Sequence, residues 1–556
     1  MSDFRPARVA LFEQLRADGV PFLVGNPGTV EQGFLDEQRN FSDVGYLLTL
    51  HEAAAVGIAD GYARATRRPG VVQLHSGVGL GNGIGMLYQA MRGHAPLVVL
   101  VGEAGLRYEP FEAQMAADLV GMARPVTKWA TRVTDPNSTL RVLRRAYKTA
   151  ATPPYGPVLV VLPADVMDGR TDEPAVPTTV PDTAGRPSAA AIGRAAALLA
   201  SARRPIVIAG DGVHFSGAQE ELGRLATLWG ARVWGADWSE VNLAASHPAY
   251  AGQLGHMFGA ASSAITREAD AVLIVGTYVF PEVFPAGAGV FGPGAPVVHI
   301  DLDTDAIAKN FPADVGIAAD PKQALRALAD ALLPRMSPGH RSAAAARIAA
   351  MTADKRAAER SGRGPAAAPD GTLHASLFGA ELARRLPADA ILFDEALTMS
   401  PDIFRYLPAD VPGRWMSTRG GSLGVGIPGA IGAKLARPDA TVVGFTGDGG
   451  SLYTAQALWT AARYDIGAKF VICNNGSYQL LRDNIRQYWR EQGIDEHALP
   501  DMFDLTRPRI DFPALSRSLG VPARRVLAAS HVGPALDEAL STPGPFLIDL
   551  VASAGR

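Results

Sequence analysis

Two polar turns near the end of the chain have the residue types of a metal site. Gly447-Asp448-Gly449-Gly450-Ser451 follows an apolar run at 441–445, and Asn474-Asn475-Gly476-Ser477 follows another at 469–473. Mg²⁺ is a hard cation that takes a few protein oxygens together with phosphate oxygens and water. We therefore expect three protein ligands: the Asp448 carboxylate, the Asn475 side-chain oxygen and the Ser477 backbone carbonyl.

The glycines of the first turn indicate a phosphate cradle. At the carboxyl end of a parallel strand, a glycine-rich turn exposes backbone N–H groups and the next helix presents its positive end. A helix over 453–464 would complete this cradle. Asn475 follows Asp448 by 27 positions, which suits one strand-helix-strand unit. The residues expected to contact the phosphate groups are Gly447, Asp448, Gly449, Gly450, Ser451 and Asn475.

A second Gly-Asp-Gly turn serves as a control within the chain. Gly210-Asp211-Gly212 also follows an apolar run, at 205–209, but no Asn-Asn pair occurs about 27 residues later. We interpret this copy as structural.

The elements that must position these turns alternate between amphipathic helices and short apolar strands. Continuous apolar strands between helices are typical of parallel sheets covered on both faces. The sequence predicts an α/β protein of three doubly wound parallel-sheet domains, with strands at 21–25, 46–50, 71–75, 96–102, 158–162, 205–209, 271–275, 296–301, 390–393, 441–445, 469–473 and 545–549.

The expected boundaries follow two changes in composition. A Pro- and Thr-rich stretch at 171–187 and an Ala- and Arg-rich run at 342–369 interrupt the alternation. We expect an N-terminal domain at 1–185, a middle domain at 186–345, a linker at 346–372 and a C-terminal domain at 373–556.

Composition excludes several classes of protein. The chain is 47% hydrophobic and 19% charged with a net charge of -3, so nothing in it would recruit nucleic acid. A single cysteine, Cys473, excludes an intrachain disulfide, and the apolar runs are too short for a membrane span. No export signal is visible near the first residues, and we expect a cytoplasmic protein.

Motifs along nearly the whole chain resemble one enzyme family. Gly-Asp-Gly followed by about 27 residues and Asn-Asn is similar to the diphosphate-binding signature of thiamine-diphosphate enzymes. The order of four further motifs resembles benzoylformate decarboxylase and its acetolactate-synthase-like relatives: Asn26-Pro-Gly-Thr29, Glu52 to Arg64, Leu74-His75-Ser76 and Gly420 to Gly432. The resemblance implies pyrimidine-binding, middle and diphosphate-binding domains, with thiamine diphosphate and Mg²⁺ as cofactors. It leaves FAD or a nucleotide in the middle domain open.

The resemblance assigns Glu52 to the cofactor. It implies that Glu52 hydrogen-bonds a pyrimidine ring nitrogen and so promotes deprotonation of the thiazolium carbon. The alternative is a carboxylate that only stabilises the start of a helix.

Three further residues match cofactor contacts of the family. Leu423 matches an apolar wedge that bends the cofactor, the Gly421 carbonyl would accept from its amino group, and Thr398 matches a hydroxyl that contacts the diphosphate. Leu423 could instead be a core residue, and Thr398 could form only a local turn.

Two residues match substrate contacts. His75 corresponds to a histidine that exchanges protons with substrate-derived groups, for which imidazole is suited at neutral pH. Thr29 stands where the decarboxylase has a serine that receives the substrate carboxylate. The alternatives are a core histidine and a helix N-cap before 30–38.

The sequence departs from the family pattern at three places. The position of a second active-site histidine falls on Val283, with Glu282 beside it as a substitute. Glu103 replaces a glutamine and is either a titratable group near the substrate or a surface charge. The stretch 480–500 is longer than in the decarboxylase, and we hypothesise a lid or specificity helix there.

We therefore predict a lyase that decarboxylates a 2-oxo acid and has possible carboligase activity. The alternative is a carboligase or lyase of the acetolactate-synthase or 2-hydroxyacyl-CoA-lyase type. A nicotinamide oxidoreductase lacks its Gly-x-Gly-x-x-Gly signature, and a non-catalytic binding protein would not need Glu52, Asp448 and Asn475. The expected partners are a small-molecule substrate and further copies of the chain, in a homodimer or homotetramer whose active site lies between subunits.

Overall fold

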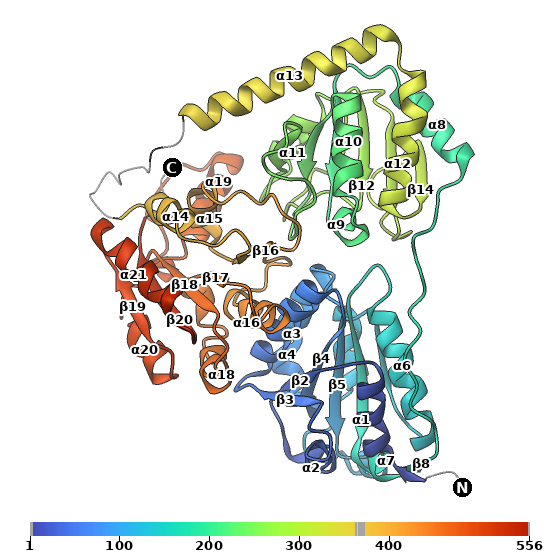
Figure 1. The fold of residues 1–556 in the computed structure, drawn as a ribbon, viewed down its shortest axis with the longest axis vertical. Helices are drawn as coiled ribbons and strands as arrows, with labels where there is room; N and C mark the ends of the chain where they lie inside the picture. The colour runs from blue at the N-terminus through green and yellow to red at the C-terminus, as the bar shows by residue number, and fades with distance from the viewer. Residues whose placement is uncertain (1–3, 362–363, 365–372, 554–556) are drawn as a thin grey trace. The chain divides into compact units, whose positions relative to one another are not determined.

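The computed structural model describes residues 4–361, 364 and 373–553. The chain divides into two compact units. The first comprises Met1–Pro181, Ala366–Tyr406 and Thr418–Arg556, and the second comprises Asp182–Pro365 and Leu407–Ser417. Three parallel sheets flanked by helices account for the predicted three-domain α/β fold (Figure 1).

The N-terminal sheet belongs to the first unit and has the strand order β3-β2-β4-β5-β7-β6. Its strands are β2 (Phe22–Gly25), β3 (Gly45–Leu48), β4 (Gly70–His75), β5 (Leu97–Glu103), β6 (Trp129–Arg132) and β7 (Pro157–Pro163), and a small antiparallel pair joins β1 (Arg5–Pro6) to β8 (Arg170–Thr171). Its helices are α1 (Ala7–Ala17), α2 (Gln32–Gln38), α3 (Glu52–Thr66), α4 (Ser76–Arg92), α5 (Leu119–Ala123), α6 (Thr139–Ala150) and α7 (Ala164–Asp168), with 3-10 turns η1 (Thr29–Glu31), η2 (Leu106–Phe111), η3 (Arg124–Val126) and η4 (Pro136–Ser138). α1 and α6 lie on one face of the sheet and α3 and α4 on the other (Figure 1).

The middle sheet belongs to the second unit and has the order β11-β10-β9-β12-β13-β14. Its strands are β9 (Pro205–Ala209), β10 (Arg232–Gly235), β11 (Tyr250–Gln253), β12 (Ala271–Val275), β13 (Val297–Asp301) and β14 (Val315–Ala318). Its helices are α8 (Ala189–Leu199), α9 (Gly212–Ser216), α10 (Gln219–Trp229), α11 (Ala260–Thr266), α12 (Pro321–Leu332) and α13 (Pro338–Ser361), with the 3-10 turn η5 (Leu333–Arg335). The segment Leu407–Ser417, which ends in the short strand β16 (Trp415–Ser417), is tied to this unit by a backbone bond from Ser417 N–H to the Ser239 carbonyl.

The C-terminal sheet of the first unit runs in the order β15-β17-β18-β20-β19. Its strands are β15 (Ile391–Asp394), β17 (Val442–Gly447), β18 (Lys469–Asn474), β19 (Ala523–Val526) and β20 (Phe546–Val551). Its helices are α14 (Ala375–Ala383), α15 (Ser400–Phe404), α16 (Gly426–Ala436), α17 (Asp448–Ser451), α18 (Ala457–Arg463), α19 (Gln479–Gln492), α20 (Phe512–Ser518) and α21 (Ala529–Ser541), with 3-10 turns η6 (Leu397–Met399) and η7 (Asp501–Phe503).

The strands that the sequence did not predict lie mostly at sheet edges. All twelve predicted strands are present. Of the other described strands, β6, β11, β14 and β19 are edge strands, β10 is next to an edge, β16 has three residues, and β1 and β8 have two residues each and pair with one another. An edge strand buries less of its surface, so its sequence lacks the continuous apolar run that marks a central parallel strand.

The predicted helix over 453–464 is wrong at its start, because α18 begins only at Ala457. The residues before it form turns, in which the Tyr453 N–H donates to the Gly450 carbonyl and the Thr454 hydroxyl donates to the Gly424 carbonyl. These contacts replace the hydrogen bonds of a regular first helical turn.

The predicted linkers differ in structure. The stretch from 172 to 188 contains no helix or strand, and the two units divide within it. Of the predicted linker 346–372, residues 346–361 belong to α13, while 362–363 and 365–372 lie outside the described residues. None of the described helices is both long and apolar enough to cross a membrane.

Glycines allow α3 and α16 to pack closely inside the first unit, where the two helices lie side by side (Figure 1). A Cβ added to Gly61 would lie 2.1 Å from the Gly429 carbonyl oxygen, and one added to Gly432 would lie 2.0 Å from the Ile58 carbonyl oxygen. The small residues of the two family motifs therefore have a packing role.

This contact predicts the effect of a larger residue on stability. Gly432→Leu would place a side chain against the backbone of α3, and we expect it to cost about 1–3 kcal/mol or more. Differential scanning calorimetry would then show a lower unfolding temperature for the first unit.

Gly81→Ala is the matched control, because nothing lies within 4 Å of a Cβ at that exposed helical position. Alanine should be neutral there or should stabilise by about 0.5–1 kcal/mol. Equal unfolding temperatures for Gly432→Leu and the wild type would contradict the packing role.

Candidate functional site

The predicted metal turns meet at one edge of the C-terminal sheet. β17 and β18 are parallel neighbours, so the turns that follow them emerge side by side. Asp448 is 5% exposed and begins α17, where its carboxylate accepts the N–H groups of Gly449 at 2.8 Å and Gly476 at 2.7 Å. The aspartate thus joins the two turns that the sequence singled out.

Burial raises the pKa of the Asp448 carboxyl, and the N–H groups of Gly449, Gly476 and the neighbouring backbone oppose that rise. Among the described residues, no Lys, Arg or His side chain forms an ion pair with Asp448. A buried carboxylate with only two short backbone donors has lone pairs left for a cation.

The Asn-Asn pair has two different roles. The Asn474 amide donates to Asp549 Oδ1 at 2.9 Å inside the sheet, so this asparagine is structural. The Asn475 side-chain oxygen accepts the Ser477 N–H at 3.0 Å, and the Ser477 carbonyl accepts the Gln479 N–H at 2.8 Å. Each of these oxygens keeps a second lone pair.

The three oxygen groups fit Mg²⁺ in their chemistry. The described residues contain no cluster of three His, Cys, Asp or Glu side chains that could bind a metal. That search does not test the predicted set, since only Asp448 belongs to those residue types. Glycine is required at 449, where a Cβ would lie 2.4 Å from the Tyr478 ring.

The loop Gly420–Gly424 lies next to the Gly447–Ser451 turn. Gly420, Gly421 and Gly424 have positive φ angles of 91°, 80° and 97°, which only glycine adopts readily. Leu423 lies close to the neighbouring turn, because a Cβ added to Gly450 would be 3.8 Å from the Leu423 Cβ. Nothing lies within 4 Å of a Cβ at Gly421, so this backbone is open to a ligand.

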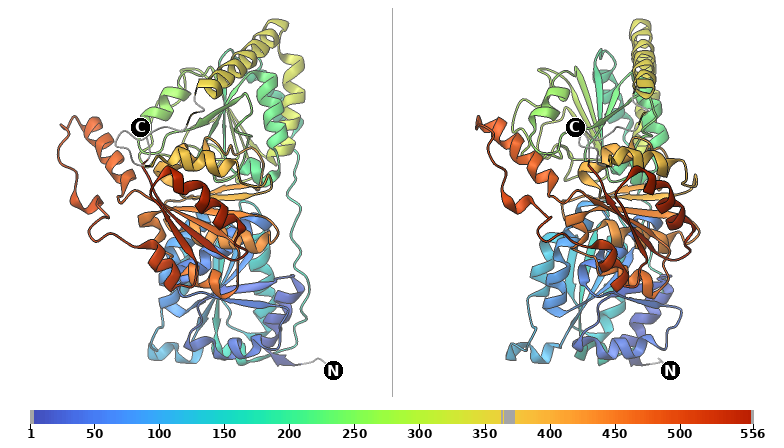
Figure 2. Two further views of the ribbon diagram at one scale, coloured as in Figure 1. Left: turned by 60° about the vertical axis from the view of Figure 1, so that its left-hand side comes forward. Right: turned by 90° about the vertical axis from the view of Figure 1, so that its left-hand side faces the viewer.

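Thr398 is half-buried on η6, directly after β15. β15 is the parallel neighbour of β17, so Thr398 and the Gly447–Ser451 turn both follow the carboxyl ends of adjacent strands. Helix α19, the hypothesised lid, contacts η6 and buries only Trp489 of its fourteen residues. Figure 2 shows α19 and the loop after it standing away from the C-terminal sheet.

Glu52 is held by two asparagines at the carboxyl edge of the N-terminal sheet. It is 5% exposed and begins α3. The Asn26 amide donates to its Oε1 at 3.2 Å, and the Asn82 amide donates to its Oε2 at 3.0 Å. Asn82 was missed in the sequence because it lies 30 residues away on α4, without a local signal.

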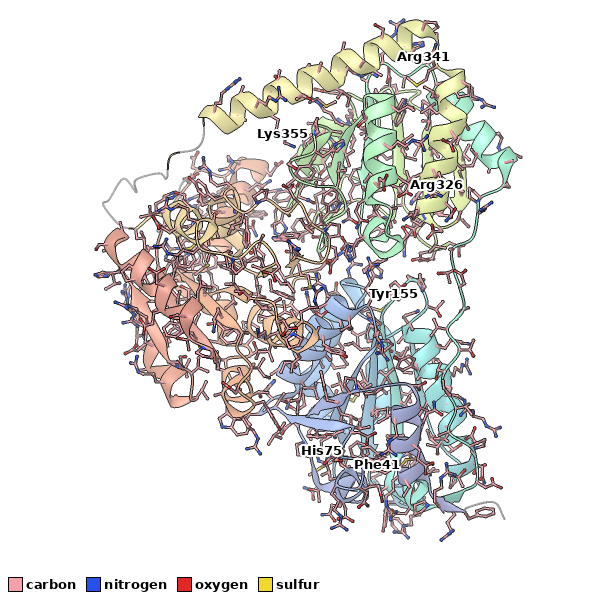
Figure 3. All side chains as sticks on the ribbon, viewed as in Figure 1. Phe41, His75, Tyr155, Arg326, Arg341 and Lys355 are labelled. Carbon is pink, nitrogen blue, oxygen red and sulfur yellow. The ribbon has the colours of Figure 1, made fainter. Side chains whose placement is uncertain are left out.

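His75, labelled in Figure 3, ends β4. Its side chain is buried beside a carboxylate that the sequence did not single out. Its Nδ1 lies 2.9 Å from Glu31 Oε2, and its Nε2 lies 3.3 Å from the Met115 sulfur. Glu31 also accepts the Gly28 N–H at 3.1 Å. An ionised Glu31 can only accept, which assigns the donor N–H to Nδ1 and leaves Nε2 toward Met115.

Two glycines make room for this pair. A Cβ at Gly28 would lie 2.0 Å from the His75 ring, and one at Gly102 would lie 2.1 Å from Glu31 Oε1. Burial raises the pKa of Glu31, and attraction to His75 works against that rise. The Asn26-Pro-Gly-Thr29 motif thus makes room for His75 through Gly28 and donates a hydrogen bond to Glu52 through Asn26.

Thr29 is exposed at the first position of η1. The expected helix starts later, at Gln32, and the N-cap of η1 is Gly28. The alternative of Thr29 as a helix N-cap is therefore wrong, and its hydroxyl stays a candidate substrate contact.

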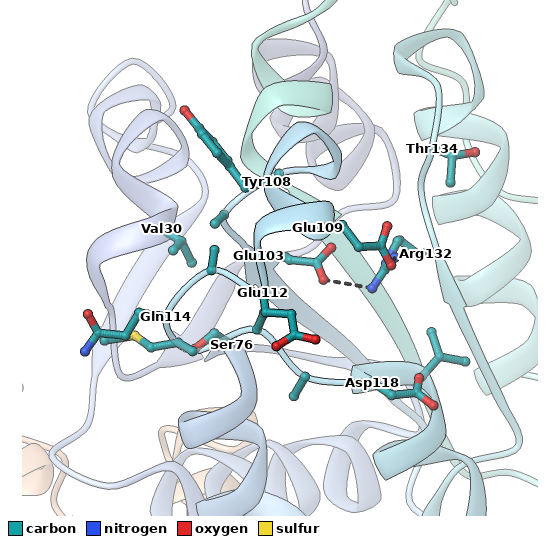
Figure 4. A pocket seen from close by; sticks show the side chains of 17 residues that line it. Val30, Ser76, Glu103, Tyr108, Glu109, Glu112, Gln114, Asp118, Arg132 and Thr134 are labelled. Carbon is teal, nitrogen blue, oxygen red and sulfur yellow. Dashed lines mark hydrogen bonds and ion pairs between the residues drawn. The ribbon is translucent and has the colours of Figure 1, made fainter.

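A cavity of about 900 Å³ lies at the carboxyl ends of β5 and β6, and its lining includes Ser76 and Met115, which are neighbours of His75. Glu103 Oε1 lies 2.8 Å from Arg132, and Glu109 Oε1 lies 3.1 Å from the same guanidinium (Figure 4). The alternative of Glu103 as a surface charge is wrong, because its side chain is only 12% exposed and burial raises its pKa. Ser76 Oγ, which follows His75, is buried without a hydrogen-bond partner in the described structure.

In the second unit, Glu282 is buried, and neither carboxylate oxygen has a hydrogen-bond partner among the described residues. Val283 is 58% exposed. The Gly210-Asp211-Gly212 copy is structural, as predicted: Asp211 accepts the Ser239 N–H and hydroxyl, the Glu240 N–H and the Asn242 amide.

Comparisons with known proteins agree with this architecture. Three family models match: "Thiamine pyrophosphate enzyme, N-terminal TPP binding domain" at residues 7–122, "central domain" at 192–328 and "C-terminal TPP binding domain" at 398–550. "Benzoylformate decarboxylase" of Pseudomonas aeruginosa is 32% identical over 97% of this chain and 98% of that protein. "Acetolactate synthase isozyme 3 large subunit" of Escherichia coli is 30% identical over 88% of this chain and 85% of that protein.

A solved structure shares the whole fold. The "Rhodococcus jostii RHA1 thiamine diphosphate-dependent 4-hydroxybenzoylformate decarboxylase" has a TM-score of 0.85 and 28% identity, covering 99% of this chain and 100% of that one.

The geometry at Asp448 predicts a metal-binding defect. Asp448→Asn keeps the size of the side chain but removes its charge, and we expect Mn²⁺ affinity in the presence of inorganic diphosphate to fall at least about tenfold. Electron paramagnetic resonance of free Mn²⁺ measures this affinity.

Asp211→Asn is the control, since that aspartate is enclosed by protein donors; Mn²⁺ binding per folded molecule should be unchanged. Equal losses in the two variants would contradict a metal site at Asp448.

Proposed function

Because the chain belongs to the thiamine pyrophosphate enzyme family, we propose that it is a thiamine-diphosphate-dependent lyase that decarboxylates a 2-oxo acid. The observation that carries this proposal is the buried Asp448 carboxylate, which joins the Gly447–Ser451 and Asn475–Ser477 turns at one sheet edge. Full-length similarity to benzoylformate decarboxylase supports the choice of reaction.

In this proposal the C-terminal sheet holds the metal and the diphosphate. Asp448, the Asn475 side chain and the Ser477 carbonyl bind Mg²⁺, while the backbone of 447–451 and the Thr398 hydroxyl contact the diphosphate. The oxygen groups that meet at Asp448 and the open backbone at Gly421 and Gly447 support this assignment.

The glycine-rich loop shapes the cofactor pocket. Leu423 projects from a loop of left-handed glycines toward the Gly447–Ser451 turn, as an apolar wedge would. Gly421 presents an open backbone, whose carbonyl accepts a hydrogen bond from the amino group of the cofactor.

Glu52 activates the cofactor by hydrogen bonding to its pyrimidine ring. Bound thiamine diphosphate supplies the electron sink for cleavage of the bond next to a carbonyl. The amides of Asn26 and Asn82 donate to both Glu52 oxygens, which fixes the carboxylate in place and leaves lone pairs for the ligand.

His75 and Thr29 serve the substrate. Glu31 holds the imidazole through Nδ1, so Nε2 is the nitrogen that exchanges a proton on the side of the cavity lined by Met115. The exposed Thr29 hydroxyl receives the substrate carboxylate. The cavity of about 900 Å³ has room for an aromatic or longer substituent.

Carbon-carbon bond formation is the second candidate activity. The similarity to an acetolactate synthase and the loop 277–285, which has no histidine, favour a carboligase or lyase. Glu282, buried with both oxygens unpartnered in the described structure, is the carboxylate of that loop. Product analysis with benzoylformate, pyruvate, aldehyde acceptors and an acyl-CoA separates decarboxylation, ligation and acyl-CoA cleavage.

If none of these compounds is turned over while thiamine diphosphate binds with Mg²⁺, both proposed activities fail.

We further propose a cytoplasmic homodimer or homotetramer with the active site between subunits. Large apolar side chains near the candidate site are exposed in the single chain, which favours a covering subunit. They are Val78, Tyr88, Leu452 and Tyr453.

Glu52→Gln is expected to keep the fold and roughly the cofactor affinity while lowering kcat at least about 100-fold, the range of general acid-base catalysis. Calorimetric titration of thiamine diphosphate with Mg²⁺ and a steady-state assay measure the two quantities. Unchanged turnover would refute the assigned role.

Glu31→Gln tests the positioning of His75. A neutral amide permits either imidazole tautomer, so we expect kcat to fall about tenfold or more with little change in KM. Steady-state kinetics checks this split. A rise in KM at constant kcat would show that Glu31 contributes to substrate binding instead.

A further inference from the structure

We propose that Glu395 is the positioning residue that holds the Gly420–Gly424 loop and the Gly447–Ser451 turn in one arrangement for the cofactor. This inference rests on the proposed cofactor function. Glu395 follows β15 directly and is 1% exposed, so it does not itself face a ligand.

One side of the carboxylate holds the glycine-rich loop where it enters α16. Glu395 Oε1 accepts the N–H groups of Gly424 at 2.7 Å and Val425 at 3.2 Å, and Oε2 accepts the Gly426 N–H at 2.8 Å. These donors lie at the start of α16, where the helix dipole favours a negative charge.

The same carboxylate reaches the strand that leads into the metal turn. The Thr446 hydroxyl donates to Glu395 Oε2 at 2.9 Å, two residues before Asp448. On the far side of the loop, the Thr454 hydroxyl donates to the Gly424 carbonyl. The end of the loop is therefore tied to the residues both before and after the Gly447–Ser451 turn.

The chemistry of the four partners requires a carboxylate. The three backbone N–H groups can only donate and use both oxygens, so only a group with acceptors on both oxygens can satisfy them at once. No cation is paired with Glu395 in the described chain. Burial raises its pKa to about 7, and the N–H groups of Gly426, Gly424 and Val425 and the Thr446 hydroxyl oppose that rise.

The adjacent carboxylate makes only local contacts. Asp394 Oδ1 accepts the Ala396 N–H at 2.9 Å and the Ser400 hydroxyl at 2.7 Å. Glu395 alone of these two links separate parts of the predicted cofactor site. The loop that Glu395 holds contains Gly421 and Leu423, and the turn that follows Thr446 contains Asp448.

Glu395→Gln is the direct test, because in either orientation its NH₂ group would face at least one backbone N–H that can only donate. We expect the Kd for thiamine diphosphate at fixed Mg²⁺ to rise about tenfold or more, as for the loss of a charged hydrogen bond. The near-ultraviolet circular dichroism of the bound cofactor should also change. Calorimetric titration, circular dichroism and the unfolding temperature of the cofactor-free protein are measured together.

Glu173→Gln is the matched control. Glu173 is 8% exposed and accepts the Leu140 N–H and hydrogen bonds from Arg141 and Arg144, all within the N-terminal part of the chain. It should lower the unfolding temperature without altering the Kd or the dichroism of the cofactor.

The outcomes separate the two proposals. If the wild-type protein does not bind thiamine diphosphate, the proposed function fails; if Glu395→Gln binds it as tightly and with the same dichroism, only the positioning role fails. Should Glu395→Gln not fold, Thr446→Val removes the link to the metal turn alone. A Kd raised about threefold would then support the role, and an unchanged Kd would overturn it.

Discussion

Parallel strands deliver their loops to one edge of a sheet, and every candidate functional side chain of this chain depends on that constraint. Glu52 follows β3, His75 ends β4 and Glu103 ends β5 in the N-terminal sheet. Asp448 and Asn475 follow the neighbouring strands β17 and β18 of the C-terminal sheet. The middle sheet obeys the same rule, yet its Gly210-Asp211-Gly212 turn is closed. A Cβ on Gly212 would lie 2.5 Å from Gly276 Cα, so backbone fills the place between β9 and β12. Each of the three sheets has loops at the carboxyl ends of its strands, and local packing determines whether those loops leave space for a ligand.

The three buried acids that follow β9, β15 and β17 differ in how completely the protein satisfies them. The carboxylates of Asp211 and Glu395 each accept hydrogen bonds from four donor groups of the protein. Asp448 has only backbone donors, two of them short, and among the described residues no side-chain donor reaches its carboxylate, so its burial is compensated only in part. Because an incompletely satisfied buried charge costs free energy, Asp448 is the acid that gains most from a bound cation. The same Gly-Asp-Gly sequence is thus structural in one sheet and a candidate ligand in another.

Local patterns in the sequence predicted the central strands, the family and the paired metal turns. The pair could be found because strand, turn, helix and strand follow one another within 27 residues. Glu31, Asn82 and Glu395 could not be found in this way, since their partners lie across strands and far along the chain: 44 residues for Glu31 and His75, and 51 for Glu395 and Thr446. Such contacts depend on sheet order, which short apolar runs do not specify. The edge strands and the place of Leu407–Ser417 in the second unit were missed for the same reason.

The charges of the cavity bear on the substrate that the proposed function leaves open. Arg132 is the basic side chain among the cavity residues, and Glu103 and Glu109 both pair with it. Glu112 and Asp118 add further negative charge to the walls. A substrate substituent that carries phosphate or carboxylate would lose hydration in this cavity and would be repelled by the acidic side chains. Arg132 would compensate little of this cost, because it is already paired with Glu103 and Glu109. Under the proposed function, a substituent that enters this cavity would therefore be neutral or cationic, unlike the phosphate-bearing part of an acyl-CoA. Ser76, the residue after His75, also lines this cavity, and its buried hydroxyl has no hydrogen-bond partner among the described residues.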